Sequence, residues 1–292
     1  MRITNKLGLP QPLVSAVERE YEYKPKRYSV TSILKGTREA ILQRRHDEEL
    51  EQDVADMIWL IFGLAVHSIL ENAQEAPSQI KEARVEANLP NGYTLSGIFD
   101  LYDDETGTVT DWKTASVWKV TFNDWDDYRT QTLAYCWILR QIGFNAHRGE
   151  IVALLKDHSK TKAEVDPSYP QFPVFRIAWD FSDEEIDAFG EFLVERFKEI
   201  ERCEALPDGE LPLCTPEERW AKPDKWAVKK KGNKKAQKLF DNEGEAIAYA
   251  ELQEKGSKYQ FEVEHRPGED TKCLKYCSVC DFCSHGKALK NA

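Results

Sequence analysis

Apolar residues recur with a helical period over residues 52–75, and this repeat predicts a long helix there. A second amphipathic helix is predicted over residues 128–142, where one apolar face is available for a core. Between these helices the pattern changes to strand-like stretches at residues 93–102 and 108–113. The intervening Asp-Asp-Glu-Thr-Gly at 103–107 has the composition of a hairpin turn. We therefore expect the two stretches to pair as adjacent antiparallel strands.

Charged side chains gather on this predicted hairpin. Asp100 lies in the first strand, within Gly97-Ile-Phe-Asp100, and Asp111 and Lys113 lie in the second. Because side chains alternate across a strand, Asp111 and Lys113 project from one face and Trp112 from the other. Two carboxylates held side by side repel each other, which raises the pKa of one of them unless a cation lies between them. Oxygen ligands of this kind suit Mg²⁺ or Mn²⁺. The alternative is a surface hairpin with a solvated aspartate and an ion pair.

Polar residues on the two predicted helices bear on this choice. Gln131 and Tyr135 lie four residues apart, hence on one face of the helix at 128–142. Beside the acids, these two side chains would bind a phosphate and the polymer chain attached to it. Without the acids nearby, they are equally well explained as a partly buried polar pair. His67 lies in the first predicted helix. By itself it is explained as a packed core histidine, whereas beside a carboxylate cluster it would be a further metal ligand.

The rest of the chain predicts more elements of a core and then a separate small module. The expected core elements are a strand at 148–156, a strand at 174–181 and a helix that Ser182 opens with a capping box and that runs to about Glu204. Three prolines then mark a linker: Pro207, Pro212 and Pro216. Residues 226–260 predict strand, Lys/Gly turn, strand and helix. The lysine cluster at 229–235 is either a DNA-contacting loop or a solvated turn.

The order of these motifs resembles that of the RecB-type branch of the PD-(D/E)xK nucleases. The motifs that carry the resemblance are His67, Gly97-x-x-Asp100, Asp111-x-Lys113 and Gln131-x-x-x-Tyr135. The branch includes the nuclease domain of bacterial recombination helicases, the CRISPR adaptation exonuclease and many phage recombination exonucleases. The match spans roughly residues 28–160, beginning with Tyr28-Ser-Val-Thr-Ser-Ile-Leu.

The resemblance implies a catalytic metal site. Asp100 and Asp111, with the backbone carbonyl of Trp112, would bind the Mg²⁺ or Mn²⁺ ion, and His67 would complete that site or serve a second ion. A divalent ion lowers the pKa of water to near neutrality and stabilises negative charge on phosphate oxygens. Such a site needs no covalent intermediate.

The resemblance also implies the roles of the remaining site residues. Lys113 would orient the attacking water and offset charge on the phosphate, while Gln131 and Tyr135 would position the scissile strand. The family often has an acid on its first core strand. Glu82 and Glu86 both lie there, and the sequence does not choose between them.

Four of the seven cysteines cluster near the C-terminus, at Cys273, Cys277, Cys280 and Cys283. Nothing at the N-terminus resembles a signal peptide and no apolar span of membrane length is expected, so a reduced cytosolic setting favours metal ligation over disulfides. Several RecB-type nucleases hold a [4Fe-4S] cluster with such a group and one distant cysteine. That cysteine usually precedes the histidine motif, whereas the first cysteine here is Cys136. By resemblance the expected ligands are Cys214, Cys273, Cys277 and Cys283, with Cys280 as an alternative ligand and zinc as an alternative cofactor.

Composition limits the remaining possibilities. The 292 residues carry 40 Lys and Arg against 51 Asp and Glu, a net charge of −11, so a DNA-binding protein would need a local basic track. No glycine-rich phosphate loop of the Walker type is found, which argues against an intrinsic ATP motor.

Together these features predict an α/β protein with a restriction-endonuclease-like core, a mixed central sheet flanked by helices. The expected organisation is an N-terminal segment (1–49), the nuclease core (50–205), a linker with an inserted ββα module (206–260) and a cysteine-cluster tail (261–292). The expected function is a cytoplasmic, Mg²⁺-dependent deoxyribonuclease, an exonuclease rather than an endonuclease, that processes DNA ends with no membrane partner. The resemblance implies a phage-type recombination role and a single-strand annealing protein as partner. The alternatives are a CRISPR-adaptation-like or structure-selective nuclease and a non-catalytic DNA-binding scaffold.

Overall fold

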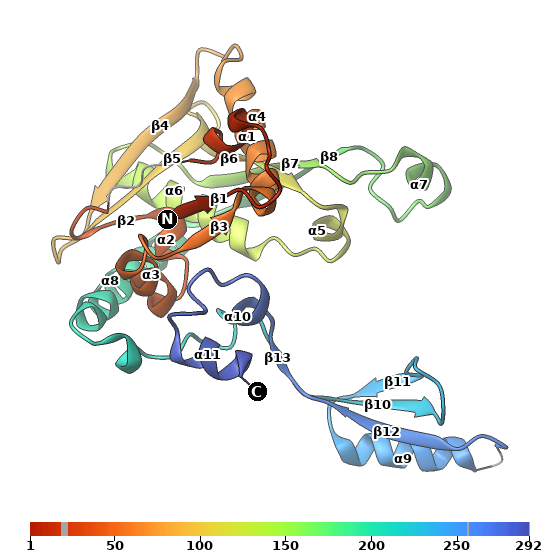
Figure 1. Cartoon of the computed structure of the whole chain (residues 1–292). Helices are drawn as coiled ribbons and strands as arrows, with labels where there is room; N and C mark the ends of the chain where they lie inside the picture. The colour runs from red at the N-terminus through yellow and green to blue at the C-terminus, as the bar shows by residue number, and fades with distance from the viewer. Residues whose placement is uncertain (19–22, 256, 292) are drawn as a thin grey trace. The chain divides into compact units, whose positions relative to one another are not determined.

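The computed structural model describes residues 1–18, 23–255 and 257–291. The chain forms two compact units, Met1–Leu206 and Pro207–Ala292. The first unit is built on a six-stranded mixed sheet of order β2-β5-β6-β7-β8, with β4 also paired to β5 (Figure 1). The strands are β2 (Arg27–Ser29), β4 (Gln79–Asn88), β5 (Thr94–Asp103), β6 (Thr108–Ala115), β7 (Arg148–Leu155) and β8 (Val174–Asp180).

Strands β4, β5 and β6 form an antiparallel meander, and β6 then pairs with β7 in parallel. Gly107 closes the β5–β6 turn with a φ of +63°, and a Cβ there would lie 2.5 Å from the carbonyl oxygen of Asn145. Glycine is therefore required at this turn. The parallel pair needs a crossover, which α5 (Val117–Thr121) and α6 (Asp126–Gln141) supply.

Helix α6 packs against β7 and against α8 (Asp183–Glu204), and α8 also packs against α3 (Thr37–Arg45). The Ser182 hydroxyl caps α8 by accepting the Glu185 N–H at 3.2 Å, as the capping box predicts. Tyr28, Tyr93 and Phe197 meet in the core, where the rings of Tyr93 and Phe197 lie 5.0 Å apart. Each such buried aromatic side chain contributes about 1.5–3 kcal/mol to folding. The expected α/β architecture, a mixed sheet flanked by helices, is thus confirmed.

The N-terminal segment forms a small layer of its own. Its elements are β1 (Arg2–Thr4), α1 (Gln11–Ser15), α2 (Val30–Ile33), β3 (Glu51–Asp53) and η1 (Val54–Met57). Strands β1 and β3 pair in parallel. Val14, Val17, Val54 and Met57 form a buried cluster against which Ile61 packs. This cluster supports the start of the next helix.

That helix, α4 (Ile58–Glu71), is apolar in sequence, yet none of its residues, all of which are described, is buried. Val54–Glu71 is long and apolar enough to cross a membrane by length and composition. The expectation that the chain has no such span is therefore wrong. Length and composition alone are weak evidence for a membrane, since the core helix of a soluble protein passes the same test. The exposed apolar surface of α4 is a feature that the helical repeat did not reveal.

The second unit contains a three-stranded sheet of order β11-β10-β12, covered by one helix. Its elements are β10 (Lys225–Lys230), β11 (Lys238–Phe240), α9 (Glu243–Glu254) and β12 (Phe261–Arg266). Val228, Ala246 and Ala250 form its core. Strand β12 lies in the stretch that the sequence assigned to the cysteine tail, and its pairing with β10 extends the module to Arg266. The other elements are α7 (Lys160–Val165) in the first unit, and η2 (Asp208–Glu210), β9 (Ala221–Lys222), β13 (Glu269–Asp270), α10 (Thr271–Lys275) and α11 (Ser284–Lys290) in the second.

Candidate active site

Asp100 and Asp111 lie on adjacent strands at the centre of the sheet. Leu101 of β5 pairs with Thr110 of β6, so the next position in the register sets Asp100 beside Asp111. Both side chains are buried. The backbone N–H of Trp112 donates to Oδ2 of Asp100 at 2.7 Å, which fixes that carboxylate against β6. The hairpin expected from the sequence thus brings its two acids together.

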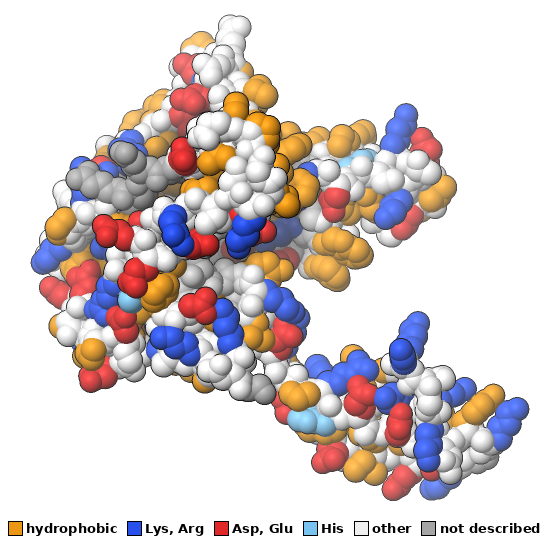
Figure 2. Space-filling model, in the orientation of Figure 1, with side chains coloured by type: hydrophobic (Ala, Val, Ile, Leu, Met, Phe, Trp, Pro, Cys, Tyr) orange, Lys and Arg blue, Asp and Glu red, His pale blue; other side chains and the backbone are white. Residues whose placement is uncertain are grey.

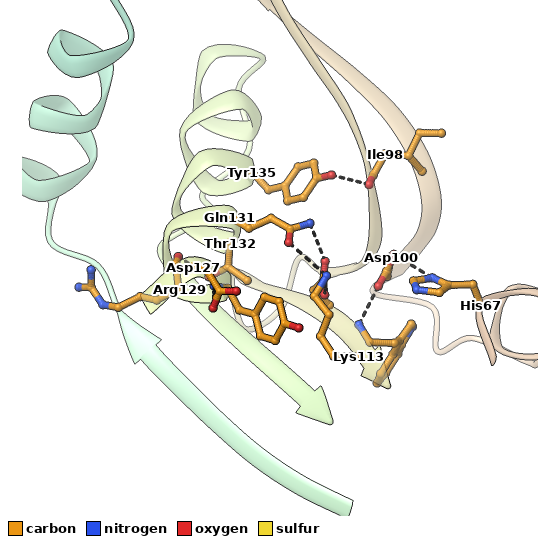
Figure 3. A network of polar contacts seen from close by, with 12 residues as sticks. His67, Ile98, Asp100, Lys113, Asp127, Arg129, Gln131, Thr132 and Tyr135 are labelled. Atoms are coloured by element: carbon orange, nitrogen blue, oxygen red, sulfur yellow. Dashed lines mark hydrogen bonds and ion pairs between the residues drawn. The ribbon is translucent and has the colours of Figure 1, made fainter. Parts of the chain in front are cut away.

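Lys113 and Gln131 complete a polar network around Asp111 (Figure 3). The ammonium of Lys113 lies 2.5 Å from Oδ2 of Asp111 and donates to Oε1 of Gln131 at 3.1 Å. The amide of Gln131 donates to Oδ1 of Asp111 at 3.1 Å. Gln131 of α6 therefore holds both Asp111 and Lys113 of β6 in a fixed arrangement.

Burial, with a smaller contribution from the nearby Asp100, raises the pKa of Asp111 to about 6 against the opposing effect of Lys113. The Lys113 ammonium is the partner of the buried Oδ2 and offsets part of the cost of burying the Asp111 charge. Two carboxylates buried side by side with a single ammonium are still costly. A divalent cation would relieve that cost, so this acid fits a metal ligand.

His67 of α4 reaches the same acids from outside the sheet. Its Nδ1 lies 3.2 Å from Oδ1 of Asp100 and 3.6 Å from Oε1 of Glu82. The hydrogen bond to Asp100 raises the pKa of His67, and burial together with the charge of Asp100 raises the pKa of Glu82. One ligand atom from each of the three residues lies within 4.8 Å of the others. Imidazole and carboxylate donors this close suit a divalent ion such as Mg²⁺ or Mn²⁺.

The geometry brings Glu82, and not Glu86, next to His67 and Asp100. Glu82 has a φ of +46°, in the left-handed region that non-glycine residues rarely adopt and that often marks functional sites. Glu86 lies opposite Ser96 and forms an ion pair with Arg27 instead. The sequence left this choice open because both residues lie on β4, four positions apart.

Tyr135 lies against the backbone of β5. Its hydroxyl donates to the carbonyl oxygen of Ile98 at 2.7 Å (Figure 3). A Cβ at Gly97 would lie 2.6 Å from Cε1 of Tyr135, so the ring occupies the space that a side chain would fill. The glycine of the Gly97-x-x-Asp100 motif thus has a steric cause. Tyr135 holds β5 in place one turn of α6 away from Gln131.

Tyr128 is a residue of this site that sequence reasoning missed. Its ring lies 4.9 Å from the ammonium of Lys113 and 4.4 Å from that of Lys119. Burial raises the pKa of Tyr128 to about 12. An aromatic ring between two ammonium groups holds them by cation–π attraction. Its position at the start of α6, one turn before Gln131, is the only signal in the sequence.

The cysteine tail forms a second cluster of possible ligands, in the second unit. Burial raises the pKa of Cys273 to about 11, with smaller contributions from Asp270, Cys214, Cys283 and Cys280. Four of the expected thiol positions therefore lie near one another.

His285 adds a ligand type to this tail that the sequence analysis did not consider. Its Nε2 lies 2.6 Å from Oδ2 of Asp270. Asp270, Cys273 and His285 each place one ligand atom within 4.8 Å of the others. The position of His285, two residues after Cys283, is the feature of the sequence that could have indicated this ligand.

The mixed sheet with paired acids and an adjacent ammonium defines the class of hydrolytic, divalent-metal nucleases. A comparison with protein-family models matches residues 15–284 to the PD-(D/E)XK nuclease superfamily. The chain belongs to this superfamily, which confirms the resemblance of its motifs at that level.

Comparison with solved structures gives the protein SSO0001, at 14% identity, covering 64% of this chain and 81% of that one with a TM-score of 0.45. It also gives a phage related exonuclease from Haemophilus somnus 129PT, at 12% identity, covering 59% of this chain and 79% of that one with a TM-score of 0.31. A comparison with curated proteins finds no match.

Proposed function

We propose that this nuclease is a Mg²⁺- or Mn²⁺-dependent deoxyribonuclease that hydrolyses phosphodiester bonds at DNA ends as an exonuclease. The observation that carries the proposal is the convergence of His67, Glu82 and Asp100 beside the network of Asp111, Lys113 and Gln131. These side chains come from separate helices and strands, and all of them serve hydrolysis of a phosphodiester.

His67, Glu82, Asp100 and Asp111, with the carbonyl of Trp112, would hold the divalent ion. When bound, the ion supplies an acidic water near neutral pH and stabilises charge on the phosphate. Its binding also makes the ionised form of Asp111 favourable, since a cation then faces the buried carboxylate.

Lys113 would act on the water and the phosphate through its ammonium. The ion pair with Asp111 and the hydrogen bond to Gln131 restrict that ammonium to one position. A preorganised cation stabilises developing negative charge without reorganisation during the reaction. Gln131 would position Lys113 and Asp111, and Tyr135 would position the strand that carries Asp100.

The test is digestion of linear duplex and single-stranded DNA labelled on one strand, with EDTA, Mg²⁺ or Mn²⁺. The parent protein should release mononucleotides or short products only with metal, and Asp100→Ala should lower the rate about 100-fold or more. Asp187→Ala, which removes an exposed carboxylate on α8, is the matched control. A parent without metal-dependent activity on either substrate would refute the proposal and favour a DNA-binding scaffold.

The same digestion separates the related nucleases. Progressive shortening from one labelled end indicates an exonuclease and gives its polarity, whereas internal cuts at junctions or flaps indicate a structure-selective nuclease. A role in phage-type recombination in the bacterial or infected-host cytoplasm, with a single-strand annealing protein that receives the product strand, is supported by the motif resemblance.

For the tail we propose a [4Fe-4S] cluster held by Cys214, Cys273, Cys277 and Cys283. The influence of Cys214 and Cys283 on the pKa of Cys273 supports three of these ligands, and Cys280, which acts on the same pKa, is the alternative ligand. Anaerobically purified protein should be brown, and Cys214→Ser should lose that colour while Cys280→Ser keeps it. The opposite result would make Cys280 the ligand, and a colourless protein with stoichiometric zinc would reject the cluster.

A further inference from the structure

Large aromatic side chains are exposed on two helices of the first unit. On α4, Trp59 is 57% exposed and Phe62 is 53% exposed; on α5, Trp118 is 62% exposed and Phe122 is 71% exposed. Hydrophobic side chains gather over both helices on the face that Figure 2 shows. Trp118 and Phe122 stack with their rings 5.5 Å apart, and Trp59 lies 5.8 Å from Phe62. We name these four residues the aromatic surface.

The two helices that carry the aromatic surface both adjoin β6, a strand of the candidate active site. Strand β6, which carries Asp111 and Lys113, ends at Ala115, and α5 begins two residues later at Val117. Helix α4 packs on β6, where a Cβ at Gly63 would lie 3.8 Å from Oγ1 of Thr114. Helix α4 also carries His67, two turns after Trp59. One helix of the aromatic surface therefore packs on the strand that holds Lys113, and the other follows that strand in the chain.

Positive charge accompanies these rings. The ammonium of Lys156 lies 4.1 Å from the centroid of the Trp59 ring. The next residue, Asp157, accepts the Ser116 hydroxyl at 2.6 Å and the Val117 N–H at 2.7 Å. One short segment thus contacts the α4 aromatic residue and caps α5. The ring of Trp59 and the cation beside it are held next to the helix that carries Trp118.

From this placement we infer that the aromatic surface binds the bases of a single DNA strand on its way to the active site. Exposed rings bind unpaired bases by stacking, and neighbouring lysines bind the phosphates between them. A base-paired duplex keeps its bases stacked on one another and does not offer their faces to the protein. The inference rests on the proposed function and deepens it, because it makes a single-stranded end the preferred substrate.

A lysine beside the aromatic surface, in a nuclease, favours a nucleic acid over a purely apolar protein partner. An apolar protein partner would leave the Lys156 ammonium without a role at the contact. A phosphate of a bound strand would instead contact the Lys156 ammonium beside the Trp59 ring.

The test measures binding to a thymidine dodecamer and to an abasic dodecamer of the same length, with Ca²⁺ in place of Mg²⁺ to slow cleavage. The parent should bind the thymidine strand more tightly, by about 5- to 150-fold for each stacked base. The double variant Trp118→Ala with Phe122→Ala should lose most of that difference and bind the two strands almost equally. Trp59→Ala should have a smaller effect in the same direction.

Phe192→Ala is the matched control, because Phe192 is an exposed aromatic residue of α8 whose ring lies 5.4 Å from the Arg196 guanidinium. It should keep the base preference of the parent. A parent that binds both dodecamers equally, or a double variant that keeps the preference, would overturn the inference. If the parent self-associates and the double variant does not, the surface binds a second copy of the chain instead. If the parent binds phosphatidylcholine vesicles and the double variant does not, the surface binds a membrane instead.

Hydrolysis of thymidine 5′-monophosphate p-nitrophenyl ester separates this inference from the proposed function. The ester is too small to reach the aromatic surface, so parent, double variant and control should hydrolyse it at equal rates. If the parent hydrolyses neither ester nor DNA, the proposed function fails. If all three hydrolyse the ester equally but the base preference is absent, only the inference about the single strand fails.

Discussion

Replacing Asp111 with asparagine should stabilise the metal-free protein. The side chain is 3% exposed, and burial raises its pKa from 3.8 to about 6. The folded protein therefore carries an ionised carboxylate at neutral pH at a cost of about two pKa units, or about 3 kcal/mol. Asparagine keeps an oxygen that can accept the hydrogen bond from Gln131. At about pH 8 the variant should be more stable by about 3 kcal/mol, with a Tm about 6–12 °C higher.

The pH dependence follows from the direction of this pKa shift. A carboxyl group with a raised folded pKa favours folding in its protonated form, so its penalty is absent below pH 3.8 and develops as the pH rises through about 6. The stability difference between the variant and the parent should thus be near zero at about pH 4 and reach its full size above about pH 7. His67, whose pKa is also raised, is present in both proteins and largely cancels in the difference.

Thermal denaturation followed by circular dichroism, in EDTA over this pH range, measures the effect. Asp187→Asn, at an exposed position of α8, should match the parent throughout. Metal at about 1,000 times the dissociation constant should reverse the order of stabilities, because it then stabilises a protein by about 4.1 kcal/mol, which exceeds the variant's metal-free advantage of about 3 kcal/mol. Mg²⁺ should therefore stabilise the parent and have much less effect on the asparagine variant.

Two results would refute this reasoning. An asparagine variant less stable than the parent at about pH 8 without metal would mean that the ion pair with Lys113 outweighs the burial of Asp111. A stability difference that does not change with pH would mean that the ionisation of Asp111 is not its cause. Either result would also remove the argument that the site needs a cation for electrostatic reasons.

Three further substitutions test other parts of the site. Gly97→Ala places a methyl group against the Tyr135 ring and should lower the free energy of unfolding, measured by chemical denaturation, by about 1–3 kcal/mol. Gly209→Ala, where no atom lies within 4 Å of the added Cβ, should leave it unchanged. Glu82→Gln should weaken Mn²⁺ binding in calorimetry by about 10-fold or more, while Glu86→Gln should not, and equal effects would remove Glu82 from the ligands. Tyr135→Phe removes the hydrogen bond to the backbone of β5 and should cost about 1 kcal/mol of stability; an unchanged midpoint would show that the bond contributes nothing.

Much of the site was predictable because its residues lie close together in the sequence. Asp100, Asp111 and Lys113 lie on two strands joined by a short turn, so alternation and register place them together without knowledge of the rest of the fold. Gln131 and Tyr135 share a helix face because they are four residues apart. The α/β class and the superfamily followed from these local patterns and their order.

The sequence by itself thus determined the helices and strands of the site, the pairing of its two acids and the class of chemistry that they serve. Only the tertiary structure brought Glu82 rather than Glu86 beside His67 and Asp100, raised the pKa of Asp111 by burial, and left α4 exposed. These properties depend on which distant segments lie against a residue, and the periodicity of a helix is the same whether its apolar face is covered or open. For that reason the aromatic surface beside the active site appears only in the folded chain.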